Sequence, residues 1–103
     1  MDNIFSALPG YQADEQFVSL LKTQTVHIER IVSLGHCSEP GFWYEQEHNE
    51  WVILLSGSAV LEFDGGSKQN LIAGSYMLIP AGRRHRVHAT AKGEQSVWLA
   101  VHY

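Results

Sequence analysis

The chain has little of what marks a secreted scaffold, a membrane protein or a nucleic-acid-binding protein. Cys37 is its single cysteine among 103 residues, so an internal disulfide is excluded and a reducing compartment is expected. Only 7 lysines and arginines stand against 11 acidic residues, which excludes the basic field that nucleic acid or an anionic membrane attracts. No transmembrane run or signal peptide is visible. We expect a cytoplasmic protein whose partners include neither nucleic acid nor a membrane.

Several catalytic signatures are also missing. The sequence has no Gly-rich phosphate loop, no nucleophile elbow around a serine and no paired-cysteine zinc pattern. What it does have is 45% hydrophobic residues, enough for one core at this length but too few for two domains. A single domain over residues 1–103 is therefore expected.

Short apolar runs separated by turn residues fill the chain after residue 24. These runs cover residues 26–32, 42–46, 51–56, 59–63, 69–72, 76–79, 86–90 and 96–103. Glycine and proline punctuate them at short intervals, which is typical of antiparallel hairpins and not of strand-helix-strand units. An all-β sandwich or barrel is predicted over residues 25–103, preceded by an N-terminal extension over 1–24.

The N-terminal extension carries apolar residues at near-helical spacing. Phe17, Val18, Leu20 and Leu21 follow Asp14, a residue type that caps helix N-termini. This pattern predicts a short helix or turn over residues 13–22.

Two of the strand-like runs are apolar on both faces. They are WVILL at 51–55 and VWLAV at 97–101, whereas a half-exposed antiparallel strand would alternate. Their outer faces need a cover, which either a second sheet of the same chain or a second copy in a homodimer would provide. The sequence leaves both explanations open.

One motif in the second half is specific. Gly74, Pro80, Gly82 and His85 follow the spacing Gly-x5-Pro-x-Gly-x2-His. The glycines allow tight turns, the proline ends a strand, and His85 begins the next strand facing inward. This stretch closely resembles the second motif of the cupin family, except that Ala89 replaces its final asparagine.

The first cupin motif is only partly present. Glu50 and Gly57 resemble its end, where the glutamate is a metal ligand and the glycine makes a turn. Tyr44 and Gln46 stand where the two ligand histidines are expected at one spacing; the alternative spacing gives Trp43 and Glu45. The His-x-His pair is therefore missing.

The resemblance implies a double-stranded β-helix, the jelly-roll barrel of cupins, with a site around His85 and Glu50. It implies a divalent metal held by Gln46, Glu50 and His85, with manganese, iron, zinc and nickel as candidate identities. A single imidazole shifts the preference toward harder ions such as manganese or magnesium. Alternatively the pocket is metal-free, and His85 and Glu50 form a polar pair able to transfer protons.

Other residues are expected near this site. Tyr44 and Phe42 are candidates for the pocket wall, and His48 shares the strand parity of Glu50 but falls in a predicted loop. His88 is predicted to face outward, and His27, His36 and His102 have no motif position. The arginines beside His85, at positions 83, 84 and 86, are either solvated turn charges or a rim for an anionic ligand.

The predicted function is binding of, or acid-base chemistry on, a small organic molecule in the barrel. The enzyme classes that fit are isomerase, lyase and hydrolase, since a dioxygenase normally needs two or more histidines on a redox metal. The alternative is a non-catalytic, metal-free binding or sensor module that acts as a homodimer. A shared barrel does not choose between these functions.

Overall fold

The chain folds into eight strands in the computed structural model, which describes residues 2–10 and 12–103. The strands are β1 (Gln16–Lys22), β2 (His27–Ser33), β3 (Glu50–Ser56), β4 (Ser58–Phe63), β5 (Lys68–Ile72), β6 (Tyr76–Ile79), β7 (His85–Thr90) and β8 (Ser96–His102). All pairings between them are antiparallel. In this described part of the chain, no helix is long and apolar enough to cross a membrane.

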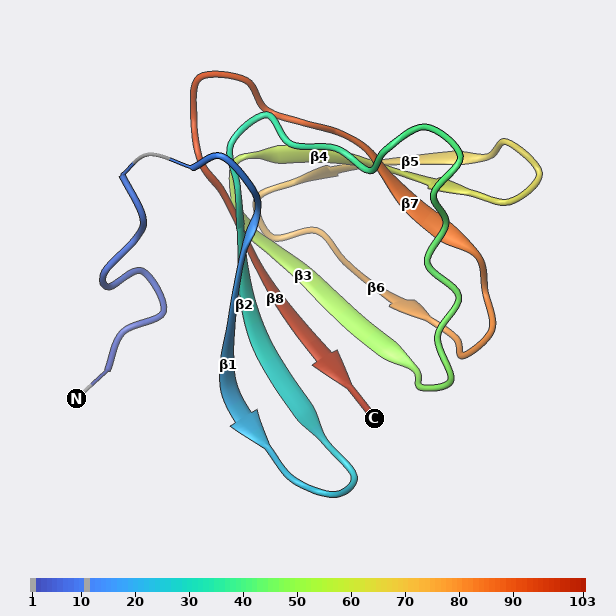
Figure 1. Ribbon diagram of the computed structural model, residues 1–103, viewed down its shortest axis with the longest axis horizontal. Coiled ribbons are helices and arrows are strands. Elements are labelled where there is room, and N and C mark those ends of the chain that lie inside the picture. The colour runs from blue at the N-terminus through green and yellow to red at the C-terminus, as the bar shows by residue number, and fades with distance from the viewer. Residues whose placement is uncertain (1, 11) are drawn as a thin grey trace.

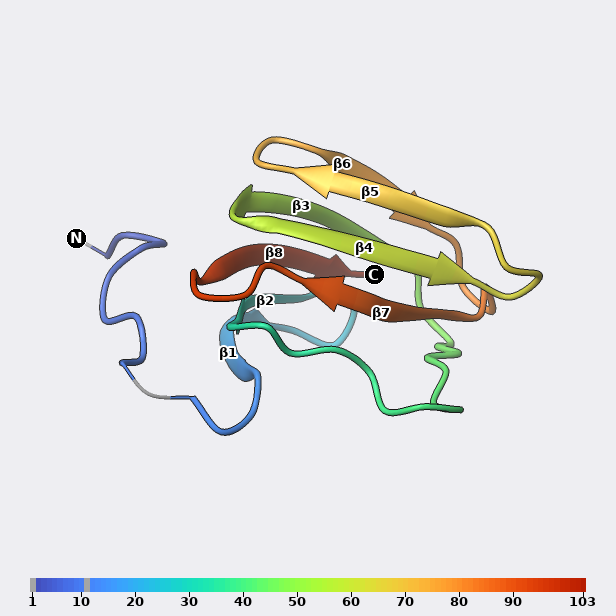
Figure 2. The ribbon, with the colours of Figure 1, turned by 90° about the horizontal axis from the view of Figure 1, so that it is seen from above.

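The strands form two sheets that face each other. One sheet has the order β1-β2-β8-β3-β6 and the other has the order β5-β4-β7 (Figure 1). The sheets lie close together where β3 passes into β4 and diverge toward the segment between β2 and β3, as Figures 1 and 2 show. Apolar side chains from both sheets fill the narrow side and form the core: Val52, Leu54, Ala59, Leu61, Phe63, Leu71, Ile79, Trp98 and Ala100.

The turn from β3 to β4 depends on Gly57. Its φ of 85° lies in the left-handed region that favours glycine, and a Cβ there would meet Ser96 Cα at 2.6 Å. The chain therefore passes from the larger sheet to the smaller one where no side chain fits. This is the glycine that resembles the end of the first cupin motif.

The all-β prediction is confirmed, but the helix predicted over residues 13–22 is wrong. That segment contains β1, the edge strand of the larger sheet. The reason is a register shift between Ser19 and Leu21, which inserts one unpaired residue opposite β2. The bulge breaks the period of two, so the apolar residues before and after it acquire helix-like spacing.

The strand predicted over residues 42–46 is also wrong. This segment is irregular and makes one isolated bridge, between Tyr44 and His85. Two backbone hydrogen bonds form it, Tyr44 N–H to His85 O at 2.7 Å and His85 N–H to Tyr44 O at 3.0 Å. The bridge fixes Tyr44 directly beside His85.

The outer face of the larger sheet is covered only in part. The N-terminal segment covers β2, where Arg30 is 7% exposed and donates to the carbonyl oxygens of Ile4 and Ser6. Beyond this cover, a row of apolar residues in register crosses all five strands: Leu21, Ile28, Val101, Trp51 and Leu78. Leu21 and Leu78 are about half exposed. The homodimer predicted to cover this face therefore stays a prediction.

Candidate functional site

A cavity of about 70 Å³ lies between the two sheets. Several water molecules, or a compound of a few heavy atoms, fill such a volume. Its apolar walls include Val52, Leu61 and Trp98 of the core. The polar side chains that line it are Glu15, Glu29, Tyr44, Gln46, Glu50, His85 and His102.

His85 begins β7, the edge strand of the smaller sheet, and is 5% exposed. Its Nδ1 lies 3.0 Å from the carbonyl oxygen of Arg83. Because a carbonyl oxygen only accepts hydrogen bonds, Nδ1 carries a proton. In the neutral imidazole, Nε2 therefore holds a lone pair, and this nitrogen is the one that faces Glu50.

Glu50 begins β3 in the larger sheet and is 9% exposed. Its Oε1 lies 3.6 Å from His85 Nε2, beyond hydrogen-bond length. No residue within the described ranges donates a hydrogen bond to this carboxylate. Since buried polar groups are normally satisfied, water or a ligand in the cavity can bond to the two side chains.

Tyr44 and Gln46 stand where the cupin motif has histidines, and both line the cavity. The Tyr44 ring stacks on His85, with centroids 5.4 Å apart. Burial raises the pKa of Tyr44, and the charges on Glu15, Glu50 and Glu29 raise it further, so the hydroxyl stays a hydrogen-bond donor. The amide oxygen of Gln46 is buried without a partner among the described residues.

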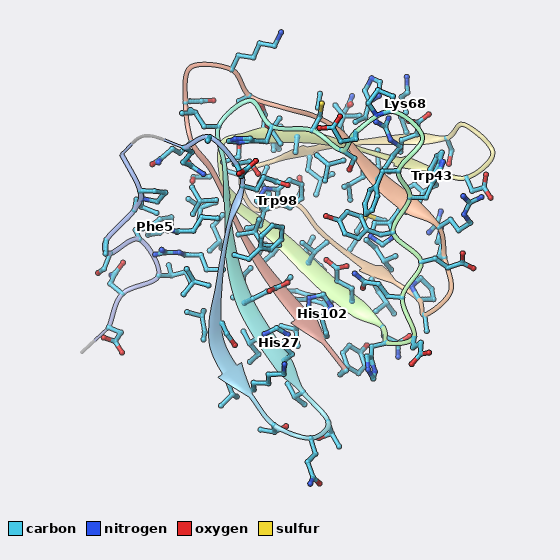
Figure 3. The ribbon with its side chains drawn as sticks, in the orientation of Figure 1. Phe5, His27, Trp43, Lys68, Trp98 and His102 are labelled. Carbon is cyan, nitrogen blue, oxygen red and sulfur yellow. The ribbon has the colours of Figure 1, made fainter. Side chains whose placement is uncertain are left out.

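A second histidine–glutamate pair, which the sequence analysis did not find, lines the same cavity. His102 at the end of β8 donates from Nε2 to Glu29 Oε1 of β2 at 2.9 Å. This bond raises the pKa of His102, the charge on Glu50 adds to the increase, and burial opposes it. Strand parity held a signal for His102, because the period of two puts it on the same face of β8 as the core residues Trp98 and Ala100. Trp98 and His102 are labelled in Figure 3.

Glu15 is the third carboxylate of the cavity and was also missed. It precedes β1 and accepts a hydrogen bond from the hydroxyl of Ser33, which in turn accepts one from Trp98 Nε1 at 3.2 Å. Its position depends on the pairing of β1 with β2, a contact that the predicted helix concealed. No cationic side chain in the described ranges pairs with Glu15.

Two predicted pocket residues lie outside this cavity. Phe42 is 46% exposed and contacts the Tyr44 ring edge-on at 4.8 Å, so it supports the wall without forming it. His48 lines a neighbouring groove, together with His27 and His102, and this groove shares Glu29, Gln46 and His102 with the cavity. His27 and His102 lie side by side, with ring centroids 5.7 Å apart (Figure 3).

The three arginines near His85 do not line the cavity. Arg83 lies over the ring of Phe63 at 3.8 Å. Arg84 pairs with Asp64 at 3.2 Å, and Arg86 pairs with Glu62 at 2.9 Å. The anionic ligand predicted from these charges stays a prediction.

The predicted ligand set, Gln46, Glu50 and His85, fits a divalent metal in the chemistry of its donors. The amide oxygen, the carboxylate and Nε2 are acceptors that lack a donor, and the Nδ1–H bond to Arg83 is the orientation that metal-binding histidines adopt. Counting only His, Cys, Asp and Glu, no group of three in the described chain is arranged to hold a metal. The amide oxygen would therefore complete a weak set of three donors.

Comparison with known proteins shows the class of protein that this fold and site define. Residues 32–102 match the family described as Cupin domain, and no curated protein matches the chain. The chain therefore belongs to the cupin family.

A solved structure from Ralstonia eutropha JMP134, named as a candidate mannose-6-phosphate isomerase, is 44% identical. The match covers 99% of this chain and 95% of that one, with a TM-score of 0.94. A cupin superfamily protein from Desulfitobacterium hafniense DCB-2 is 20% identical over 92% of this chain and 82% of that one, with a TM-score of 0.77. The second similarity shows the fold alone.

Proposed function

We propose that the cavity binds a small organic molecule and that His85 and Glu50 transfer a proton on it. The observation that carries this proposal is the open geometry of the pair. A lone pair on Nε2 and a carboxylate lie 3.6 Å apart, both buried and both facing the cavity. A pair in that state is free to act on a third group.

The residues suggest the following proton transfer next to a carbonyl group. His85 Nε2 takes a proton from the carbon beside the carbonyl, and the electron pair left behind moves to the carbonyl oxygen as an enolate. Glu50 stabilises the resulting imidazolium, and the hydroxyl of Tyr44 donates a hydrogen bond to the enolate oxygen. Isomerisation needs a hydroxyl on the carbon that loses the proton. The hydroxyl proton then moves to the former carbonyl oxygen, His85 returns its proton to the former carbonyl carbon, and the oxygen left without a proton becomes the new carbonyl.

The similarity to the Ralstonia eutropha protein supports an isomerase as the reaction class. It does not carry over the phosphate group of that protein's named substrate, because no lysine or arginine of the described chain lines this cavity. Lyase and hydrolase chemistry use the same pair and remain the other enzyme classes of the proposal. The cytoplasmic location also remains a prediction.

A divalent metal at Gln46, Glu50 and His85 would polarise a ligand oxygen as a Lewis acid. The metal and a substrate proton need the same lone pair on His85 Nε2. We therefore assign proton transfer to the metal-free pair, and binding without turnover to the metal-bound one.

Proton exchange with solvent tests this proposal. Three ketones of three carbon atoms would each be incubated with the protein in D2O: aminoacetone, hydroxyacetone and pyruvate. We expect proton NMR to show deuterium entering at least one of them about 100-fold faster with the wild type than with His85→Ala or Glu50→Gln. His88→Ala is the matched control, since this exposed histidine lies on the same strand. Equal rates in the wild type and His85→Ala would refute the catalytic role.

The second candidate is a binding or sensor module without catalysis. The observation that favours it is the apolar outer row of the larger sheet, which suits a second copy of the chain. This candidate predicts that the same ketones bind in the cavity while no deuterium enters them.

A further inference from the structure

The cavity is rich in negative charge. Three carboxylates line it, those of Glu15, Glu29 and Glu50, and no lysine or arginine of the described chain does. Among the described residues that line it, the imidazoles of His85 and His102 are the only side chains that can carry a positive charge. Even with both imidazoles protonated, the carboxylates outnumber them.

The uncompensated charge lies on Glu15. Glu29 is paired with His102 at 2.9 Å, and Glu50 faces His85 at 3.6 Å. Within residues 2–10 and 12–103, the only hydrogen-bond partner of Glu15 is the hydroxyl of Ser33. A metal on Glu50 would leave Glu15 unchanged, so the excess charge does not depend on whether a metal is bound.

The three carboxylates line one cavity although they come from separate segments. Burial raises the pKa of Tyr44, which lines the same cavity, and the charges of all three carboxylates raise it further. Glu50, only 9% exposed, also accepts no hydrogen bond from any residue in the described ranges. A ligand in the cavity that carries an N–H or O–H donor would satisfy this carboxylate.

The remaining walls suit an organic occupant. The buried Trp98 lines the cavity, as do Phe17 and Tyr44. Aromatic faces attract cations and also contact alkyl groups. In the part of the chain that the structure describes, no three His, Cys, Asp or Glu side chains are arranged to hold a metal together, so the three carboxylates are spaced more widely than the ligands of one metal ion.

We propose that this cavity selects a small organic cation, a compound of a few heavy atoms that carries a protonated amine. The ammonium group lies among Glu15, Glu29 and Glu50 and donates the hydrogen bond that Glu50 lacks, while the alkyl part lies against Trp98. This proposal is opposite in charge to the anionic ligand predicted from the arginines. It rests on the proposed function only in that the cavity binds an organic molecule.

The three ketones used above also test this selection, because they are similar in size and differ mainly in charge. Aminoacetone is cationic, hydroxyacetone is neutral and pyruvate is anionic. The indole N–H of Trp98 reports binding, since it is linked through Ser33 to Glu15. Trp43 and Trp51 do not line the cavity and serve as controls in the same ¹H–¹⁵N spectrum.

We expect aminoacetone to shift the Trp98 indole signal with a Kd at least about tenfold lower than that of hydroxyacetone, at constant ionic strength. Pyruvate should give no shift. Glu15→Gln keeps an acceptor for Ser33 but removes the charge, so it should remove most of this preference. Glu94→Gln, which removes a charge in an exposed turn, should leave this preference unchanged.

Equal affinity for the three ketones, or a preference for pyruvate, would overturn the proposal in the wild type without any variant. Unchanged aminoacetone binding in both Glu15→Gln and Glu29→Gln would overturn it as well. Deuterium exchange in pyruvate with no aminoacetone binding would refute the proposed selection of a cation but not the proposed proton transfer. Aminoacetone binding without exchange would refute the proton transfer but not the selection of a cation.

Discussion

The two histidine–glutamate pairs of the cavity differ in how the fold makes them. His102 and Glu29 lie on neighbouring strands of one sheet and are joined by a 2.9 Å hydrogen bond. His85 and Glu50 come from different sheets and stay 3.6 Å apart. Strand register brings the first pair, here called the closed pair, within hydrogen-bond distance. The spacing between the sheets keeps the second pair, here called the open pair, too far apart for a hydrogen bond. The groups of the closed pair satisfy each other, whereas those of the open pair are left free for the binding and proton transfer proposed above.

The largest expected difference between the pairs is in metal binding. His85→Ala and Glu50→Ala each remove one of three donors, so we expect Mn²⁺ affinity to fall by about 100-fold or more. His102→Ala should keep the affinity within a few-fold. Equilibrium dialysis followed by elemental analysis measures this. Retention of Mn²⁺ in His85→Ala, or its loss in His102→Ala alone, would reverse the assignment of the two pairs.

A smaller effect is expected on stability, and there the closed pair dominates. Glu29→Gln weakens the charged bond to His102, so we expect a loss of about 1–2 kcal/mol in the free energy of unfolding at about pH 6. Since the folded pKa of His102 is raised from 6.5, its added stabilisation is fully present below that value. It is lost as the pH rises through the folded pKa.

Urea unfolding at about pH 6 and about pH 9 measures that dependence. The difference in the free energy of unfolding between the wild type and Glu29→Gln should be larger at the lower pH. Glu50→Gln is the comparison, and it should cost little or nothing at either pH, because its carboxylate has no hydrogen bond to lose. A difference in the free energy of unfolding that grows with pH would contradict the stabilising role of the His102–Glu29 pair.

The smallest effect on either pair is expected from the outer face of the larger sheet. Leu78→Lys places a charge in the apolar row, so we expect the predicted homodimer to dissociate. Ketone and Mn²⁺ binding should change less than about twofold, since Leu78 does not line the cavity. Light scattering measures the mass of both proteins. If the wild type is a monomer at micromolar concentration, the prediction of a homodimer is wrong.

The sequence predicts most of this fold because its signals are local. Turn glycines and the spacing from Gly74 to His85 place the strands from β3 to β8 within a residue or two. The misses are features that depend on distant contacts. A bulge gives β1 the spacing of a helix, and residues 42–46 lack a strand partner except at Tyr44.

Only the part of the candidate site that carries motif residues was predicted, because the rest also depends on distant contacts. Motif positions identify His85 and Glu50, and Tyr44 and Gln46 follow from the missing histidines. Glu29 and His102 belong to no motif, and they meet only because β2 pairs with β8 across 73 residues of sequence. Glu15 enters the cavity through β1, the strand mistaken for a helix. The sequence therefore does not reveal the carboxylates of Glu15 and Glu29, because their positions depend on long-range strand pairing.

The most direct test of the account compares matched variants of the two pairs. Deuterium exchange into aminoacetone would be followed with the wild type, His85→Ala and His102→Ala, each freed of metal by a chelator. The account predicts exchange about 100-fold slower in His85→Ala than in the wild type, and within about tenfold of the wild type in His102→Ala. Exchange that survives in His85→Ala but stops in His102→Ala would contradict it.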